Sequence, residues 1–187
     1  MSIINQDYQK QIQAMHDNGK FNNGAKQFKL VVPFINEYQP KNLIDFGCGK
    51  GALIATIKEN YPAIDVFGYD PGNPDFSVMP NRTFDTIVST DALEHIEPEH
   101  LTASLGMMSE RMERCGFFRI ACYLAKKSLP DGRNCHLIVK EPAWWREQIL
   151  QHMAVDIVWE NITVVDKRHK HPNLYGHNYD VIMVKKA

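Results

Sequence analysis

Residues 45–51, with the sequence DFGCGKG, have the composition of a ligand-binding turn. Glycine lets a backbone bend tightly and lets a ligand approach it without a Cβ atom in the way. The spacing is GxGxG, whereas loops that bind the pyrophosphate of a dinucleotide have GxGxxG. The carboxylate of Asp45, two residues before the first glycine, would repel a diphosphate and attract a cationic amine or sulfonium. These residues therefore indicate a ligand that carries positive charge.

A second acidic residue, Asp70, follows the next strand-like run, 19 residues after Gly51. A carboxylate at the end of the second strand of such a unit can accept hydrogen bonds from both ribose hydroxyls of an adenosine group. A glycine turn that only packs a strand against a helix would need neither acid. The combination of both acids with three glycines favours a nucleoside-binding site.

These motifs resemble those of the class I S-adenosylmethionine-dependent methyltransferases. LIDFGCGKG is similar to the first motif of that family, VFGYDPG to the second and FDTIVSTDALEHIEP to the fourth-strand motif, so the resemblance covers about residues 43–98. It implies S-adenosylmethionine as cofactor, with S-adenosylhomocysteine as product. It also implies that the glycine turn holds the methionine part and that the acid after the second strand holds the ribose. The cofactor-binding residues that it implies are Asp45, Gly47, Cys48, Gly49, Asp70, Pro71, Thr90 and Asp91.

The stretch between Asp70 and Phe84 is short for this family. Its 13 residues, PGNPDFSVMPNRT, include three prolines, whereas a βαβ crossover alone needs about 10–12 residues or more. We therefore expect the usual third strand to be vestigial or absent. Backbone groups, with Phe76 or Val78, would then cover the adenine.

The run DALEH is a first candidate for the acceptor side of the site. Asp91, Glu94 and His95 stand at positions i, i+3 and i+4, which places them on one face of a helical turn. Two carboxylates and an imidazole could hold Mg²⁺, Mn²⁺ or Zn²⁺, and the run is similar to the metal-binding positions of some ubiquinone-pathway O-methyltransferases. A helix start explains the same residues without a metal, because the helix dipole favours acids there. The sequence leaves the metal open.

A second candidate is the insertion, residues 122–143, which follows the strand predicted at residues 117–123. Arg133 and Asn134 suit recognition of a carboxylate, a phosphate or a sugar. The adjacent Trp144 and Trp145 cannot both face one core, since a helix turns about 100° per residue, so we expect one of them to form a wall for the acceptor. The alternative is a long loop that an arginine ties down and that one tryptophan caps in the core.

Histidine is the side chain best suited to take a proton from a hydroxyl acceptor near neutral pH. His136 and His95 are the candidate general bases, whereas a carboxylate acceptor would need no base. A third group, His169, His171 and His177, has no carboxylate or cysteine within its pattern, so we interpret it as a solvated surface loop.

Helical and strand-like segments alternate along the chain and must position these residues. We expect helices near residues 8–15, 26–38, 52–61, 98–112 and 142–153, and strands near residues 42–46, 65–69, 83–89, 117–123, 155–165 and 179–185. This order predicts an α/β fold with a doubly wound, mainly parallel sheet, which is the Rossmann-like fold that the resemblance implies. We expect a single domain, residues 1–187. It comprises an N-terminal helical lid segment (residues 1–40) and a Rossmann-like core (residues 41–187) that includes the insertion.

The composition is that of an ordinary globular domain, with 44% hydrophobic and 23% charged residues. The formal net charge of −1 gives no strong field for nucleic acid or for an anionic membrane. No apolar run approaches the ~18–20 residues that span a bilayer, and the first residues lack the pattern of a signal peptide. Four cysteines without a CxxC pair are read as reduced thiols, so we expect a cytoplasmic protein.

The sequence therefore predicts an S-adenosylmethionine-dependent methyltransferase that acts on a small-molecule or glycan acceptor, at oxygen. An RNA or protein acceptor stays an alternative, as does a non-catalytic S-adenosylmethionine-binding subunit. An NAD-dependent oxidoreductase is disfavoured by the GxGxG spacing and by Asp45. Helix faces alone do not predict the oligomeric state.

Overall fold

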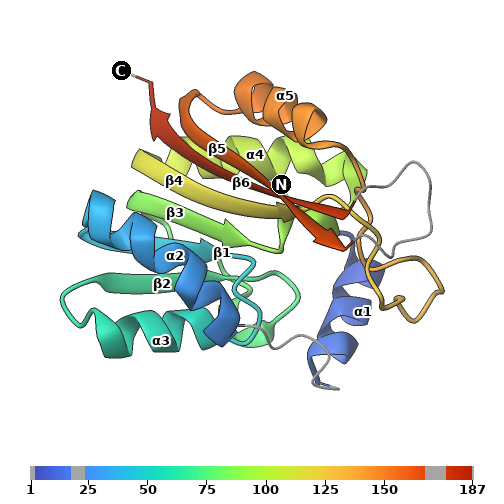
Figure 1. The fold of residues 1–187 in the computed structure, drawn as a ribbon. Coiled ribbons are helices and arrows are strands. Elements are labelled where there is room, and N and C mark those ends of the chain that lie inside the picture. Colours follow the sequence, from blue (N-terminus) through green and yellow to red (C-terminus); the bar gives the residue numbers. More distant parts are fainter. Residues whose placement is uncertain (1–2, 18–23, 167–175, 187) are drawn as a thin grey trace.

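A six-stranded mixed sheet runs through the centre of the molecule (Figure 1). The computed structural model describes residues 3–17, 24–166 and 176–186. The strands are β1 (Asn42–Phe46), β2 (Asp65–Tyr69), β3 (Phe84–Thr90), β4 (Met112–Ala121), β5 (Val155–Asp166) and β6 (Gly176–Lys185). Their order in the sheet is β2-β1-β3-β4-β6-β5. The first four pair in parallel and β6 pairs antiparallel with both β4 and β5, which confirms the predicted doubly wound, mainly parallel sheet.

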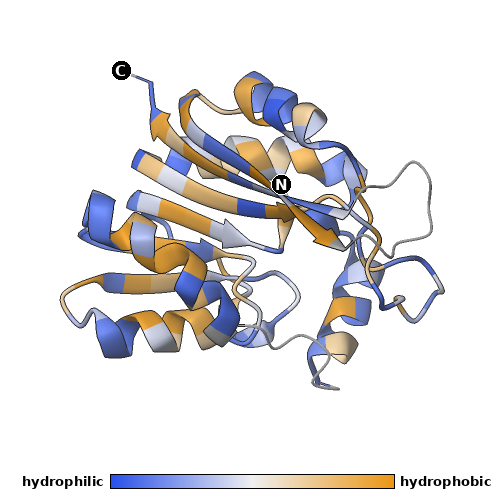
Figure 2. Ribbon diagram, in the orientation of Figure 1, coloured by the Kyte–Doolittle hydropathy of each residue, from blue (hydrophilic) through white to orange (hydrophobic). Residues whose placement is uncertain are grey.

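Helices cover both faces of this sheet. They are α1 (Gln6–Asp17), α2 (Gly24–Tyr38), α3 (Ala52–Asn60), α4 (Leu101–Arg111) and α5 (Pro142–His152). Successive strand residues point to opposite faces: Leu43 packs in the cluster beneath α2 and α3, and Ile44 in the cluster beneath α4 and α5. Figure 2 shows the hydrophobic residues concentrated along the central strands. Among the described residues, no helix combines the length and apolar character needed to cross a membrane.

The third strand usual in this family is absent, as the sequence predicted. Residues 71–83 form one short 3-10 turn, η1 (Pro74–Phe76), and otherwise irregular backbone. Proline lacks the N–H that a strand ladder needs, and three prolines in 13 residues leave no room for a paired strand. β2 is therefore an edge strand of the sheet.

β4 begins five residues earlier than predicted and ends two residues earlier. The sequence placed Met112 at the end of a helical apolar stripe, but Met112 has an extended backbone (φ −83°, ψ 124°) and is the first residue of the strand. Its side chain is still buried in the core. The chain thus passes from α4 into β4 without a loop. The helical spacing of apolar residues continues by chance from the helix to Met112, which is why the sequence did not reveal the junction.

α1 and the insertion lie together beyond the carboxyl ends of the strands (Figure 1). Tyr8, Ile12 and Met15 on α1 form a separate apolar cluster with Leu129 and Cys135 of the insertion. α2, in contrast, packs on the sheet. Of the predicted lid segment, α1 is the part that is positioned to cover a ligand.

Candidate active site

A cavity of about 540 Å³ opens at the carboxyl ends of the strands, where doubly wound folds bind their ligands. α1, the glycine loop (residues 47–51), the end of β3, the turn η2 (Leu93–His95) and the insertion line it. This volume suits a small organic ligand. Two chemically distinct groups of residues face it, one at the glycine loop and one around η2.

The backbone of the glycine loop faces the cavity in a conformation that suits glycine. Gly47 has a φ of +83°, and a Cβ atom there would lie 2.3 Å from the Cβ atom of Ala92. The Gly47 and Cys48 amides donate to the Tyr69 carbonyl at 2.7 and 3.2 Å, which ties the loop to β2. Burial raises the pKa of the Cys48 thiol, so Cys48 lines the cavity as a neutral group.

Asp70 shapes the loop with its carboxylate. Its two oxygens accept hydrogen bonds from the Gly49 and Gly72 amides, each at 2.8 Å. The His16 Nε2 atom of α1 lies 3.8 Å from the same carboxylate. Burial is the main reason that the pKa of His16 is lowered, and the Asp70 charge opposes this. Asp70 therefore joins the glycine loop, the turn after β2 and α1 at one point of the cavity wall.

Asp45 lies behind the glycine loop rather than on the cavity surface. It is 2% exposed, and its Oδ1 atom makes no hydrogen bond with the part of the chain that the structure describes. Burial, with a smaller contribution from Asp70, raises the pKa of Asp45 to about 7. A positive charge placed at the loop would favour the ionised carboxylate, because it would offset the penalty of burial.

The end of β3 contributes Thr90 and Asp91, and both line the cavity. The Gln27 side chain of α2 donates to the Thr90 carbonyl at 3.0 Å and to the Asp91 carboxylate at 3.5 Å. Burial raises the pKa of Asp91. Pro71 also lines the cavity, and its carbonyl accepts from Gln9 of α1 at 2.7 Å. Apart from the recessed Asp45, the predicted cofactor-binding residues thus surround one space.

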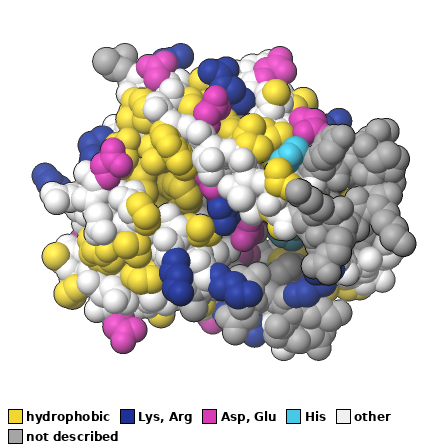
Figure 3. Space-filling model, in the orientation of Figure 1, with side chains coloured by type: hydrophobic (Ala, Val, Ile, Leu, Met, Phe, Trp, Pro, Cys, Tyr) yellow, Lys and Arg dark blue, Asp and Glu magenta, His cyan; other side chains and the backbone are white. Residues whose placement is uncertain are grey.

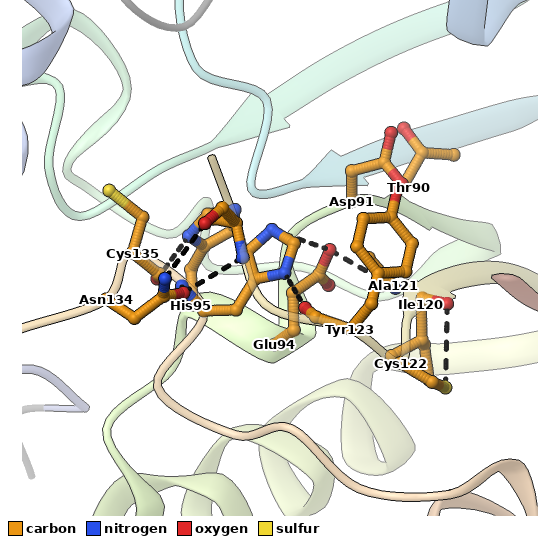
Figure 4. Close-up of polar contacts among 12 residues, drawn as sticks. Thr90, Asp91, Glu94, His95, Ile120, Ala121, Cys122, Tyr123, Asn134 and Cys135 are labelled. Carbon is orange, nitrogen blue, oxygen red and sulfur yellow. Dashed lines mark hydrogen bonds and ion pairs between the residues drawn. The ribbon is translucent and has the colours of Figure 1, made fainter. Parts of the chain in front are cut away.

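At the other end of the cavity, Glu94, His95 and His136 form a cluster, and their ligating atoms all lie within 4.8 Å of one another. Figure 4 shows Glu94 between His95 and Tyr123. The His95 Nδ1 atom lies 2.7 Å from the Cys135 carbonyl, and the His136 Nδ1 atom lies 2.5 Å from the Tyr123 carbonyl. A carbonyl only accepts, so both rings carry their hydrogen on Nδ1.

The electrostatics of the cluster keep both rings neutral. Burial, together with His136, lowers the pKa of His95 to about 3. Burial also lowers the pKa of His136, although the Tyr123 carbonyl opposes that change. The pKa of Glu94 is raised well above its ordinary range, first by complete burial and then by the charge of Asp91. Both histidines therefore present an Nε2 atom that can accept a proton or ligate a cation.

The structure corrects the set of metal-ligating residues considered from the sequence. η2 starts at Leu93, so Asp91 is not on a helical turn with Glu94 and His95, and it has a φ of +52°. Its carboxylate faces Gln27, and Figure 4 shows it beyond the Tyr123 ring from Glu94. His136 takes its place in the cluster.

The four residues predicted to contact the acceptor do not line the cavity. Trp145 is fully buried in the core, and Trp144 packs against the same core from α5. Arg133 pairs with Asp131 at 2.8 Å. The Asn134 side chain exchanges two hydrogen bonds of 2.9 Å with the Ala125 backbone, so it organises the insertion. An acceptor wall at the tryptophans is therefore not supported.

The residues predicted to cover the adenine, and His177 of the third histidine group, also lie elsewhere. Phe76 packs beneath Gly51 and Gly68, and Val78 is 79% exposed. His177 lies near Glu141. His169 and His171 lie outside the described residues.

The sequence predicted a helical lid segment over residues 1–40 but did not identify the α1 residues that line the cavity. The Tyr8 hydroxyl donates to the His95 carbonyl at 2.5 Å, and the Asn5 amide donates to Glu97 at 2.9 Å. Tyr8, Ile12 and His16 all line the cavity. The spacing of Tyr8, Ile12 and Met15 indicated an amphipathic helix, but it carried no information on whether the apolar face covers a core or a ligand.

Comparison with known proteins agrees with this geometry. The methyltransferase-domain family matches residues 23–183. No curated protein matches the chain in sequence. A solved S-adenosylmethionine-dependent methyltransferase from Clostridium acetobutylicum has a TM-score of 0.63 at 11% identity, over 94% of this chain and 97% of that one.

Two further solved structures contain S-adenosylhomocysteine. The magnesium protoporphyrin IX methyltransferase of Synechocystis has a TM-score of 0.59 at 14% identity, over 86% of this chain and 83% of that one. The 1,6-didemethyltoxoflavin-N1-methyltransferase of Burkholderia thailandensis, solved with its substrate, has a TM-score of 0.59 at 12% identity, over 96% of this chain and 87% of that one. At these identities the likeness establishes the fold.

Proposed function

Because this chain belongs to the methyltransferase-domain family, we propose that it transfers the methyl group of S-adenosylmethionine to a hydroxyl oxygen of a small organic acceptor, such as a metabolite or a sugar. The observation that carries the proposal is the position of two neutral histidines in the same cavity as the glycine loop. The loop accounts for the donor, and the histidines account for an acceptor that must lose a proton.

The donor end suits a ligand with a nucleoside and a cationic tail. We assign the ribose to Asp70, which lines the cavity, and the methionine part to the glycine loop with the buried Asp45 behind it. Two of the solved structures with this fold contain S-adenosylhomocysteine. Thr90 and Asp91 would border the sulfonium.

At the acceptor end, His136 is the proposed general base, with His95 beside it. The acceptor hydroxyl would give its proton to the His136 Nε2 atom, while the oxygen attacks the methyl carbon and the carbon–sulfur bond breaks. The products are a methyl ether and the neutral thioether S-adenosylhomocysteine, and the proton stays on the imidazole until solvent takes it. The sulfonium already activates the methyl group, so alignment and deprotonation are the main tasks of the protein.

A small acceptor fits the surroundings of the cavity. α1 and the insertion close over it from two sides, and Figure 3 shows basic side chains interspersed with acidic and hydrophobic ones on the visible face. The solved relatives include enzymes named for a porphyrin and for a toxoflavin precursor. An RNA or protein acceptor would be expected to use a continuous basic or extended groove.

A cofactor titration tests the donor half. The purified protein is titrated calorimetrically with S-adenosylmethionine, S-adenosylhomocysteine and NAD. We expect the first two to bind and NAD not to bind. Binding of NAD alone, or of none of the three, would contradict the proposal.

A screen of small acceptors with S-adenosylmethionine labelled in its methyl group tests the acceptor half. With the acceptor identified, His136→Ala should lower kcat by about two to four orders of magnitude, with the Kd of S-adenosylmethionine unchanged. Transfer only to RNA or protein would reject the small acceptor, and binding without transfer to any class would favour a non-catalytic subunit.

A further inference from the structure

We propose that Glu94, His95 and His136 form a site for one divalent transition-metal ion, such as Zn²⁺ or Mn²⁺, at the acceptor end of the cavity. The inference deepens the proposed function, since the acceptor oxygen would lie at this site, but metal binding itself does not depend on methyl transfer. Two imidazole nitrogens and one carboxylate oxygen favour such an ion over Mg²⁺ or Ca²⁺, which prefer oxygen ligands.

The tautomers of the two histidines are those of metal ligands. Both Nδ1–H groups donate to backbone carbonyls, of Cys135 and Tyr123. Metal-ligating histidines almost always donate their second nitrogen to such a partner, which fixes the ring and leaves the other nitrogen as the ligand. The rings stand edge to face at 86°, with centroids 4.8 Å apart, and the nearest ligating atoms of the two histidines and Glu94 lie within 4.8 Å of one another.

Glu94 supplies the charge that a cation would need. Its side chain is completely buried, and its Oε2 atom has no hydrogen-bond partner among the residues described. The Oε1 atom accepts a long bond, of 3.2 Å, from the Ala121 amide. Buried carboxyl groups are nearly always paired or coordinated. A cation between Glu94 and the two imidazoles would satisfy the unpaired oxygen.

The distances between the ligating atoms are somewhat longer than those around a bound metal, so a metal would bring the three side chains closer together. The His136 Nε2 atom lies 3.9 Å from the Glu94 Oε1 atom, which is too far for a hydrogen bond. Ligand atoms around tetrahedral zinc, with bonds of 2.0–2.2 Å, lie roughly 3.3 Å apart. Separations of up to 4.8 Å among the three ligating atoms would have to shorten by about 0.6–1.5 Å to reach that spacing, a shift that side-chain rotations can supply, whereas a hydrogen-bonded Glu–His pair would already be in contact.

The arrangement also contains more than a general base requires. One histidine suffices to take a proton, yet here a second histidine and a buried carboxylate converge on it from η2. All three side chains line the cavity, so a cation would keep coordination positions open to a ligand, as catalytic metal sites do. An acceptor oxygen at such a position would be polarised by the cation, which would then replace His136 as the activating group.

Titration with Co²⁺ tests the site directly, because its visible absorption reports ligand type and geometry. The full-length protein is stripped with a chelator, and Co²⁺ is added to wild type, Glu94→Gln, His136→Ala and His95→Gln. We expect one Co²⁺ per wild-type chain, displaced by Zn²⁺. Each substitution should weaken binding at least about 100-fold, since losing even a partner of a ligand weakens it 10–100-fold. Thermal unfolding without metal identifies any variant that fails to fold.

Two control variants define the ligand set. Asp91→Asn and the double variant His169→Ala/His171→Ala should bind Co²⁺ as the wild type does. The proposal would be overturned if the wild type did not bind Co²⁺. It would also be overturned if the folded variants Glu94→Gln and His136→Ala bound Co²⁺ as tightly as the wild type does. A third contrary outcome is loss of binding in Asp91→Asn with retention in His136→Ala. Titration of the same samples with S-adenosylmethionine tests the proposed function separately, since either ligand can bind while the other fails.

Discussion

Replacing Asp45 by asparagine tests the electrostatic design of the cofactor loop. Burial and Asp70 raise the pKa of Asp45 from its ordinary value of 3.8 to about 7. A difference of about three pKa units, at 1.36 kcal/mol each, means that the ionised carboxylate lowers the free energy of unfolding by about 4 kcal/mol relative to the neutral acid. Asparagine has nearly the same shape and cannot ionise, so Asp45→Asn should not carry this penalty.

The sign of the effect follows from which state loses its proton first. Below about pH 4 the carboxyl is protonated in both states, so it adds no pH dependence. Between about pH 4 and pH 7 only the unfolded chain ionises, and the stability of the wild type falls as the pH rises; above about pH 7 the penalty is constant. From pH 4.5 to pH 8, Asp45→Asn should gain about 3 kcal/mol relative to wild type in urea unfolding without ligand.

Cofactor binding should respond in the opposite direction. S-adenosylmethionine brings a positive charge to the loop, so its binding favours ionised Asp45 and releases a proton. The affinity of the wild type should rise up to about fivefold between pH 6 and pH 7, whereas that of Asp45→Asn should stay flat in the same calorimetric titration. Parallel pH profiles of the two proteins, in unfolding or in binding, would refute the assignment of the buried acid.

Four further substitutions separate the cofactor loop from the core. Asp70→Ala removes the hydrogen bonds from the Gly49 amide of the glycine loop and from the Gly72 amide of the turn after β2 and should raise the Kd of S-adenosylmethionine by about 100-fold in calorimetry, at about 1.5 kcal/mol or more for each bond to a charged group. Gly47→Ala should lower the free energy of unfolding by at least about 2 kcal/mol, because φ is +83° and the new Cβ atom would meet Ala92. Trp145→Ala should destabilise the protein by about 3–5 kcal/mol in urea unfolding, and the partly buried Trp144→Ala should do so by less, with the KM for the acceptor unchanged in both.

The cofactor half of the site was predictable because its residues are close in sequence. A strand, a glycine turn and an acid after the next strand fix their own geometry, since parallel strands end at one edge of the sheet. Gly47, Gly49 and Asp70 accordingly meet in the cavity wall. The absent third strand was predictable for a similar reason, because 13 residues with three prolines could not hold it.

The acceptor half was not predictable from spacing, because it is built by contacts between distant segments. His136 reaches Glu94 only because the insertion returns across the end of β4, where the Ala121 amide also meets Glu94. Asp91 looked closer to Glu94 in sequence, but a turn of backbone with φ of +52° directs it toward Gln27. Helical spacing applies only where the backbone is helical.

The residues first read as acceptor contacts have a different part in the site. The Asn134 Oδ1 atom accepts hydrogen bonds from the backbone amides of Ala125 and His136, each at 2.9 Å, and so fixes the backbone position of His136. Arg133 is engaged by Asp131, two residues earlier. Polar residues in a long loop can either recognise a ligand or organise the loop itself, and the sequence could not distinguish these two roles. The insertion uses them for the second, and it also holds His136, the residue that we propose as general base.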